Sequence, residues 1–270
     1  MNFESLSVSL DRGVATVEFS RPEKANALDG TSWKELPVCF RELSRNPACR
    51  VVVLSGQGKH FCAGIDLGYL MGVGQITQND CEGRRREDMR EFILDLQIAI
   101  NEIEKCKKPV IAAVHGGCIG AGVDIISACD MRFSVEDAYF QVKEIDIGMV
   151  ADLGTLQRLP RIIADGIARE MCYTARKVSG REAAGFGLVN KAFASREEMM
   201  EEVIAVAANI ASKSPLSIRG TKEMLLYTRD HSIEDGLNYI ATWNAAMLLS
   251  EDLAKAMQAA MTRQTPEFKD

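Results

Sequence analysis

Short apolar stretches alternate with helical patterns over the first 160 residues. This alternation restricts the possible folds more than any other feature of the sequence. Residues 51–54 and 110–114 are short runs rich in β-branched side chains. Between them, apolar residues recur at helical spacing over 89–103. A strand, a helix and a further strand predict a βαβ unit with a right-handed crossover and a largely parallel sheet. We therefore expect an α/β fold.

The segments before residue 80 are expected to form a hairpin, a helix and an irregular stretch. Residues 5–19 alternate apolar and polar positions on both sides of Asp11-Arg12-Gly13, which predicts a β-hairpin. Segment 29–44 has helical character, with a break or kink expected at Pro37. The chain from 61 to 80 is rich in glycine, and we expect it to be irregular.

The second half of the chain changes from strands to helices. Short strands are expected at 131–134 and 139–142. From about residue 161 onward the pattern is helical, over 161–171, 181–187, 197–211, 215–228 and 233–261. We assign residues 1–195 to an α/β core and residues 196–270 to a helical C-terminal region used for packing and oligomerisation.

Composition excludes several classes of protein. Lys and Arg number 32 against 38 Asp and Glu, a net charge of −6, so the basic face of a nucleic-acid or anionic-membrane binder is not expected. The longest apolar runs fall far short of the ~20 residues of a membrane span. The eight cysteines form no CxxC pair, and the three histidines lie at no zinc-ligand spacing. We expect no metal site, and we expect reduced cysteines in a reducing compartment.

Two glycine-bearing segments, 61–67 and 115–124, each follow a predicted buried strand. Open α/β sheets bind ligands at the carboxyl ends of their strands, and glycine lets backbone N–H groups approach a ligand closely. The second segment also opens a helix, whose N-terminus favours negative charge. Neither segment matches a dinucleotide, P-loop, nucleophile-elbow or zinc-protease motif. Two tight turns that use glycine only for packing remain an alternative.

Three carboxylates lie in apolar neighbourhoods: Asp124, Glu144 and Asp152. Burying an unpaired carboxylate is costly and raises its pKa. A raised pKa is what general acid–base catalysis near neutral pH requires. Each residue alone could be a helix cap or part of a surface ion pair, and Asp152 could cap the helix that it precedes. Together the three favour a site for proton transfer.

The segments Ala63-Gly64-Ile65-Asp66-Leu67, 115–124 and 154–160 resemble the enoyl-CoA hydratase/isomerase (crotonase) superfamily. The resemblance runs from about residue 6 to residue 261, and within the superfamily it is strongest to isomerases that convert 3,5-dienoyl-CoA to 2,4-dienoyl-CoA in fatty-acid β-oxidation. It implies a crotonase-like spiral of ββα units with a helical C-terminal trimerisation region. It also implies a homotrimer or a homohexamer.

The resemblance assigns the two glycine segments to an acyl-CoA substrate. The backbone N–H groups of Ile65 and Ala121 would form an oxyanion hole for the thioester carbonyl. Family members usually have glycine at the position of Ala121, so this hole is expected to be slightly tighter. Coenzyme A is part of the substrate, so no separate cofactor is expected. The residues implied in binding it are Ala25, Ala27, Ala63, Gly64, Asp66, Leu67 and Gly120.

The residues at positions 124, 144 and 152 distinguish the hydratases of this superfamily from the dienoyl-CoA isomerases. Hydratases of the superfamily carry glutamates at the positions of Asp124 and Glu144 and a glycine at that of Asp152. The set found here is the dienoyl-CoA isomerase pattern. We expect Glu144 to take the C2 proton, Asp152 to help deliver a proton at C6, and Asp124 to supply or orient the second proton-transfer group.

Three alternatives remain at this stage. They are a 2-enoyl-CoA hydratase of the same superfamily, an RNA-binding crotonase-like protein, and a non-catalytic CoA-binding protein. No targeting signal is visible, so the chain would be cytoplasmic if bacterial, or in the mitochondrial matrix or peroxisome if it is a processed eukaryotic form. Cys62 and Cys118 lie in the two ligand segments and are expected to react with alkylating agents.

Overall fold

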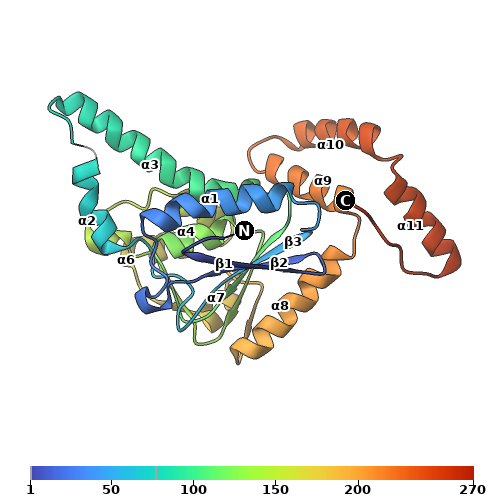
Figure 1. Ribbon diagram of the computed structural model, residues 1–270, viewed down its shortest axis with the longest axis horizontal. Coiled ribbons are helices and arrows are strands. Elements are labelled where there is room, and N and C mark those ends of the chain that lie inside the picture. The colour runs from blue at the N-terminus through green and yellow to red at the C-terminus, as the bar shows by residue number, and fades with distance from the viewer. Residues whose placement is uncertain (1, 77) are drawn as a thin grey trace.

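A six-stranded sheet forms the centre of the molecule in the computed structural model, which describes residues 2–76 and 78–270. The strand order is β1-β2-β3-β4-β6-β9; β1 and β2 pair antiparallel, and every other pair is parallel. The predicted largely parallel α/β sheet is confirmed (Figure 1). Its strands are β1 (Leu6–Asp11), β2 (Val14–Phe19), β3 (Val51–Gly56), β4 (Val110–Val114), β6 (Met131–Val135) and β9 (Lys191–Phe193).

A two-residue turn joins β1 to β2. Asp11 pairs with Val14, which leaves Arg12 and Gly13 as the turn, with φ of 44° and 85°. Positive φ at both central residues is the geometry whose twist matches that of the flanking strands. The predicted hairpin is confirmed.

A second sheet of three short strands, in the order β5-β7-β8, explains how the chain winds. These are β5 (Gly117–Ile119), β7 (Tyr139–Gln141) and β8 (Val178–Ser179). After β4 in the large sheet the chain enters β5 in the small sheet and then α4 (Ala121–Ala128). After β6 in the large sheet it enters β7 in the small one. These two turns each contribute one strand to each sheet before the next helix, as a spiral of ββα units requires.

Helices cover both faces of the large sheet. Helices α1 (Gly30–Arg45) and α3 (Glu82–Lys105) pack on each other on one side, and α8 (Arg196–Ala211) packs across β3, β4 and β6 on the other (Figure 1). The buried residues from both sides form one apolar core. The remaining helices are η1 (Pro22–Lys24), α2 (Leu67–Ile76), η2 (Glu144–Ile147), α5 (Thr155–Arg158), η3 (Leu159–Arg161), α6 (Asp165–Thr174), α7 (Gly180–Gly185), α9 (Pro215–Tyr227), α10 (Ile233–Met247) and α11 (Glu251–Thr262).

Two expectations for the first half of the chain are wrong, namely a break of the helix at Pro37 and an irregular course over 61–80. Helix α1 runs unbroken across Pro37, because buried side chains on both sides of the proline, such as Trp33 and Phe40, hold the helix to the core. The stretch 61–80, expected to be irregular, contains α2. The Asp66 side chain starts this helix by accepting hydrogen bonds from the backbone N–H groups of Gly68 (2.9 Å) and Tyr69 (3.2 Å).

The C-terminal half also departs from expectation. The single helix predicted over 233–261 is two helices, because the side chain of Ser250 accepts a hydrogen bond from Leu253 N and starts α11. The part expected to be purely helical also contains the short strands β8 and β9, which complete the edges of the two sheets.

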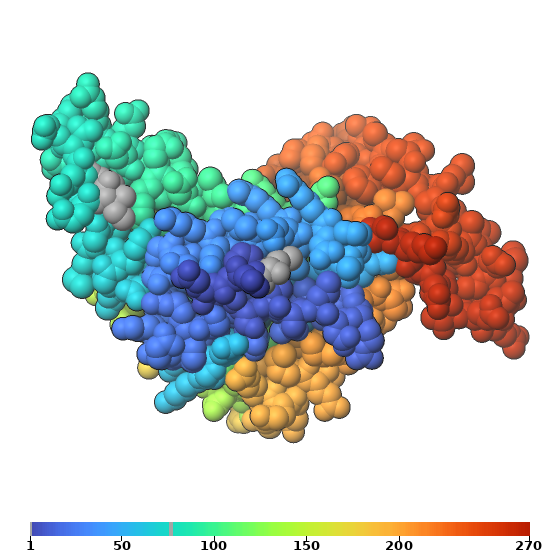
Figure 2. All heavy atoms as spheres, viewed as in Figure 1, coloured from blue at the N-terminus to red at the C-terminus, as the bar shows by residue number. Residues whose placement is uncertain are grey.

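Helices α10 and α11 stand away from the body of the molecule (Figures 1 and 2). They and their linker expose large apolar side chains, including Ile233 (82%), Leu237 (64%) and Leu249 (93%). Within the described residues, no helix is both long enough and apolar enough to cross a membrane.

Candidate active site

The two glycine segments run side by side. Cys62 N donates a hydrogen bond to Gly117 O (3.1 Å), and Ile119 N donates one to Cys62 O (2.9 Å). Gly64 has a φ of 89°, and a Cβ at that position would lie 2.8 Å from Ile119 O. Both the backbone conformation and the close approach therefore require glycine at this point.

Two backbone N–H groups are free where these segments meet. Within the described residues, neither Ile65 N nor Ala121 N donates a hydrogen bond to a protein acceptor. Ala121 is the first residue of α4, where backbone N–H groups lack intrahelical partners. A Cβ built on Gly64 would lie 3.4 Å from Ala121 N, so the donors come from segments in contact. The arrangement offers two donors at the positive end of a helix.

Five of the residues expected to bind coenzyme A belong to two segments joined by hydrogen bonds. Ala63 N donates to Ala25 O (3.0 Å), and the Arg21 guanidinium donates to Ala27 O (2.5 Å) and lies 3.8 Å from the Asp66 carboxylate. Gly64, next to Ala63, accepts a hydrogen bond at its carbonyl from Leu28 N (2.8 Å). The segment 25–28 thus lies along the first glycine segment.

The other two expected binding residues lie at the ends of this arrangement. Leu67 begins α2 with 62% of its surface exposed. Gly120, the residue before α4, has a φ of 53°, and its N–H donates to Gln141 O (2.9 Å). The structure brings Gly120 close to Gly64 through the contact of the two glycine segments.

Asp124 is buried in the first turn of α4, with 1% of its surface exposed. Its Oδ1 accepts a hydrogen bond from Thr155 N (2.6 Å), and its Oδ2 is buried with no hydrogen-bond partner among the described residues. Burial raises the pKa of Asp124 to about 6, although the hydrogen bond from Thr155 opposes this shift.

Glu144 begins η2 and lies beside the second glycine segment. A Cβ on Gly120 would come within 3.3 Å of Glu144 Oε1, so the side chain reaches this segment only because residue 120 is glycine. Glu144 Oε2 is buried and has no hydrogen-bond partner within the described part of the chain. Burial raises the pKa of Glu144 to about 7, and the charge of Asp124 raises it as well.

Asp152 is half-buried in the loop before α5. Its backbone carbonyl accepts a hydrogen bond from Gln97 Nε2 (2.7 Å), and burial raises the pKa of its carboxyl group. The helix-cap alternative is wrong, because the residue that precedes α5 is Gly154. Asp152 also lines a cavity of about 520 Å³ with polar side chains that include Gln97 and Gln157.

The three carboxylates lie close enough to influence one another electrostatically. The charges of Asp124 and Asp152 both raise the pKa of Glu144, and the charge of Asp152 raises that of Asp124. Burial and these neighbouring negative charges both disfavour the ionised carboxylates, which suits the group to holding and releasing protons near neutral pH. The site therefore combines two free N–H donors with groups suited to general acid and base chemistry.

Comparison with known proteins places this site in a family. The model of the enoyl-CoA hydratase/isomerase family matches residues 9–270. The chain belongs to this family. It is 48% identical to "Delta(3,5)-Delta(2,4)-dienoyl-CoA isomerase, mitochondrial" of Pongo abelii over 261 residues, which cover 96% of this chain and 80% of the relative.

Other members show the same similarity in sequence and in fold. The chain is 47% identical to the protein of Arabidopsis thaliana named as the peroxisomal form of the same isomerase, with 98% of this chain and 96% of the relative covered. The crystal structure of an enoyl-CoA hydratase from Bacillus anthracis superposes with a TM-score of 0.89 at 29% identity, over 98% of this chain and 99% of that one. The spiral fold is that of the enoyl-CoA hydratase/isomerase family.

Two positioning contacts in this enoyl-CoA hydratase/isomerase site lie outside the set predicted from sequence. Thr155 holds Asp124 through its backbone N–H, and Gln97 holds the loop of Asp152 from α3. Neither has a signal of its own in the sequence, because each contact joins segments that meet only after the spiral has closed.

The expected reactivity of Cys62 and Cys118 is wrong for the folded chain. Both side chains are fully buried, and burial raises the pKa of Cys62 to about 12. A thiol without access to solvent and without thiolate character does not react readily with alkylating agents. These cysteines instead pack the two glycine segments together.

Proposed function

We propose that this chain is an isomerase that converts 3,5-dienoyl-CoA to 2,4-dienoyl-CoA in fatty-acid β-oxidation. The observation that carries the proposal is the third carboxylate, Asp152, which acts electrostatically on both Asp124 and Glu144. An acid at a second position suits a reaction that removes and adds protons at two distant carbons. The names of the relatives from Pongo abelii and Arabidopsis thaliana support the same reaction.

In the proposed mechanism the thioester oxygen accepts hydrogen bonds from the N–H groups of Ile65 and Ala121. Glu144 removes a proton from C2; the electron pair of that C–H bond forms a C1=C2 double bond, and the C1=O pair moves onto the thioester oxygen to give an enolate. When the oxygen pair returns to re-form C1=O, the C1=C2 pair moves to C2=C3. The C3=C4 pair moves to C4=C5, and the C5=C6 pair takes a proton at C6 from Asp152. The N–H donors stabilise the enolate oxygen that forms between these steps.

Asp124 has a supporting part in this proposal. It is almost fully buried, one of its oxygens is held by Thr155 N, and its charge raises the pKa of Glu144. We assign to it the orientation of the second proton-transfer group. Coenzyme A would lie along Ala25, Ala27, Ala63, Gly64, Asp66, Leu67 and Gly120, and no separate cofactor takes part.

We also propose that the chain assembles with copies of itself into a trimer or a hexamer. The exposed apolar side chains of α10 and its linker to α11, described above, support self-association, because large apolar side chains exposed on neighbouring elements are typical of an interaction surface.

A spectrophotometric assay with a 3,5-dienoyl-CoA tests the proposed reaction. The expected result is a new absorbance from the conjugated 2,4-dienoyl thioester, with no such signal from the Glu144→Gln variant. The same preparation is also given a 2-enoyl-CoA. Loss of enoyl absorbance there, with no conversion of the 3,5-diene, would replace the isomerase with a hydratase.

A further inference from the structure

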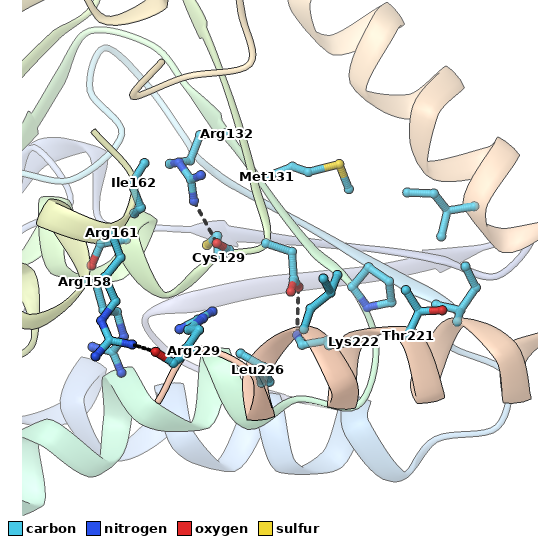
Figure 3. A pocket seen from close by; sticks show the side chains of 16 residues that line it. Cys129, Met131, Arg132, Arg158, Arg161, Ile162, Thr221, Lys222, Leu226 and Arg229 are labelled. Atoms are coloured by element: carbon cyan, nitrogen blue, oxygen red, sulfur yellow. Dashed lines mark hydrogen bonds and ion pairs between the residues drawn. The ribbon is translucent and has the colours of Figure 1, made fainter. Parts of the chain in front are cut away.

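A second pocket adjoins the polar cavity that Asp152 lines, and the two share the lining residues Arg158, Arg161, Leu226 and Arg229. The second pocket has a volume of about 450 Å³ and opens between the start of β6, the end of α4, η3 and α9 (Figure 3). Pro109, directly before β4, and Met131, the first residue of β6, both line it. It therefore lies at the amino ends of these parallel strands, whereas the glycine segments follow the carboxyl ends of β3 and β4.

Four arginines line this pocket: Arg132, Arg158, Arg161 and Arg229. Figure 3 shows Arg158, Arg161 and Arg229 gathered at one end, with Arg132 reaching in from β6. Such a cluster is unexpected in a chain with a net charge of −6. We refer to the site as the arginine pocket.

The carboxylates around the arginine pocket do not balance its charge. Glu104 is shared between Arg158, at 3.1 Å, and Arg229. Asp130 is held by Lys222 Nζ (2.7 Å). Arg161 donates only to Arg229 O (2.6 Å) and, among the described residues, has no carboxylate partner.

Arg132 also has no carboxylate partner in the described part of the chain. Its guanidinium donates only to backbone carbonyls, those of Leu188 (2.8 Å), Cys129 (2.8 Å) and Ile126 (3.3 Å). Burial lowers the pKa of Arg132 and the positive charge of Arg229 lowers it further, although the negative charge of nearby Asp130 opposes this shift. A guanidinium removed from water with no carboxylate hydrogen-bonded to it is destabilised, and a bound oxyanion would relieve this.

Apart from Ser127, Asp130, Thr221 and Lys222, the rest of the arginine pocket is apolar. Its remaining wall is formed largely by aliphatic side chains, and Leu225 is 65% exposed. A simple inorganic anion would leave this wall uncovered, whereas an anion with an apolar body would bury it. The aliphatic lining residues are Met131, Ile162, Ile210, Ile218, Leu225 and Leu226.

We propose that the arginine pocket binds an organic anion with an oxyanion head group, a carboxylate or a phosphate, and a short apolar body. The head group lies against Arg132, Arg161 and Arg229, because guanidinium groups bind both kinds of oxyanion through paired N–H donors. The body lies along Leu225 and Ile162.

Calorimetric titration of the full chain at constant ionic strength tests this site without any acyl-CoA, so the result does not depend on the proposed isomerase activity. The probes are inorganic phosphate, hexanoate and hexyl phosphate. We expect saturable binding at one site per chain for at least one of the two hexyl probes, tighter than for inorganic phosphate. Comparison of hexanoate with hexyl phosphate identifies the preferred head group.

Matched variants separate specific binding from charge screening. Arg161→Gln is expected to weaken binding of the hexyl probe at least about tenfold, the ratio that ~1.4 kcal/mol represents. Arg181→Gln, the same charge change at an exposed arginine that pairs with Glu136, is expected to leave it unchanged. Leu225→Ser is expected to weaken binding of the hexyl probe and to leave binding of inorganic phosphate unchanged. The proposal is overturned by absence of saturable binding, or by equal losses in the two arginine variants.

Discussion

Glu144, Asp124 and Asp152 are held where their ionised forms are disfavoured. Each is at least half-buried, and the charges of the other two oppose the ionisation of Glu144. A carboxyl group whose pKa is about 7 can accept and release a proton at neutral pH, which an ordinary exposed glutamate near pKa ~4.3 cannot do efficiently. Burying these carboxyl groups close together costs stability, and the raised pKa values that result suit the groups to proton transfer.

Removing either proton-transfer group should abolish most of the activity. Glu144→Gln and Asp152→Asn are each expected to lower kcat by at least ~10²-fold, the usual contribution of general acid–base catalysis. Asp146→Asn serves as a control, because this exposed carboxylate lies in the same short helix as Glu144 and pairs with Lys143 (2.5 Å). Near-normal turnover by both site variants in the dienoyl-CoA assay would refute the assigned roles.

The same group should make stability depend on pH. The pKa of Glu144 is about 7 in the folded chain, above its value of ~4.3 in an unfolded chain. The contribution of Glu144 to the free energy of unfolding is therefore fully present below pH ~4.3 and is lost as the pH rises through about 7. Glu144→Gln is therefore expected to melt at a higher temperature than the parent at about pH 8.

Thermal unfolding followed by circular dichroism measures this difference. The gain should be of the order of 2 °C or more at about pH 8, and it should be much smaller at about pH 4, where the glutamate is mostly protonated in both states. Asp146→Asn should show no gain that depends on pH. A gain for Glu144→Gln that is the same at both pH values would contradict this account.

Solvent should supply the proton that arrives at C6. One turnover leaves Glu144 protonated and Asp152 ionised, so the acid must regain a proton before the next. Asp152 borders the polar cavity of about 520 Å³, which gives it a route to water. Isomerisation in D2O should place deuterium at C6, detected by mass spectrometry and NMR of the product. Quantitative transfer of the C2 hydrogen to C6 would rule out this route.

The glycine segments act through backbone shape, and one position tests this directly. Gly64→Ala should destabilise the fold by ~1–3 kcal/mol and lower kcat, because residue 64 needs a positive φ and a Cβ there would lie 2.8 Å from Ile119 O. Urea denaturation and the dienoyl-CoA assay measure the two effects.

Gly166→Ala in α6 is the matched control for this change. A Cβ at Gly166 meets nothing within 4 Å, so the variant should be as stable as the parent or more stable by ~0.5–1 kcal/mol. Equal stability and activity in the Gly64→Ala and Gly166→Ala variants would show that the close contact of the two segments is not required.

Sequence patterns predicted the elements with strong periodicity and missed those that depend on distant packing. The hairpin and the buried strands carry their own signals, namely positive-φ turn residues and β-branched runs. Helix α2 was missed because its glycines obscure the pattern, although Asp66 caps it. The unbroken course of α1 across Pro37 depends on core contacts that no local pattern contains.

The candidate site, like the fold, was predictable from the sequence only in part. The apolar neighbours of Asp124 and Glu144 indicated burial, and the structure places both side chains in buried surroundings. The hydrogen bonds from Thr155 to Asp124 and from Gln97 to the Asp152 loop were not predictable, because each joins residues 31 or 55 positions apart in the chain. Convergence of such segments is a property of the closed spiral.

The molecule as a whole leaves an unpartnered apolar surface on its C-terminal helices, and assembly should cover it. We expect sedimentation to give the mass of three or six chains. Introducing charge at Ile233 and Leu237, as Ile233→Glu with Leu237→Glu, should reduce that mass, because both side chains lie exposed on α10.

Asn238→Glu is the control for assembly. It adds a charge to the same helix at a position that is already polar and exposed, so the mass should stay that of the parent. A parent chain that sediments as a monomer would refute the assembly, and an unchanged mass for the double variant would place the interface elsewhere.

The two free donors at Ile65 and Ala121 belong to the main chain, and this has a consequence for how such a protein can be altered. Side-chain replacement removes neither N–H group unless proline is introduced, so the proposed activation of a thioester would depend on the path of the main chain itself. The carboxylates, by contrast, are separate and exchangeable. Changing the carboxylates would alter which carbons lose and gain protons, while the two backbone N–H donors stay in place. This fold is therefore a suitable starting point for engineering new reactions of acyl thioesters.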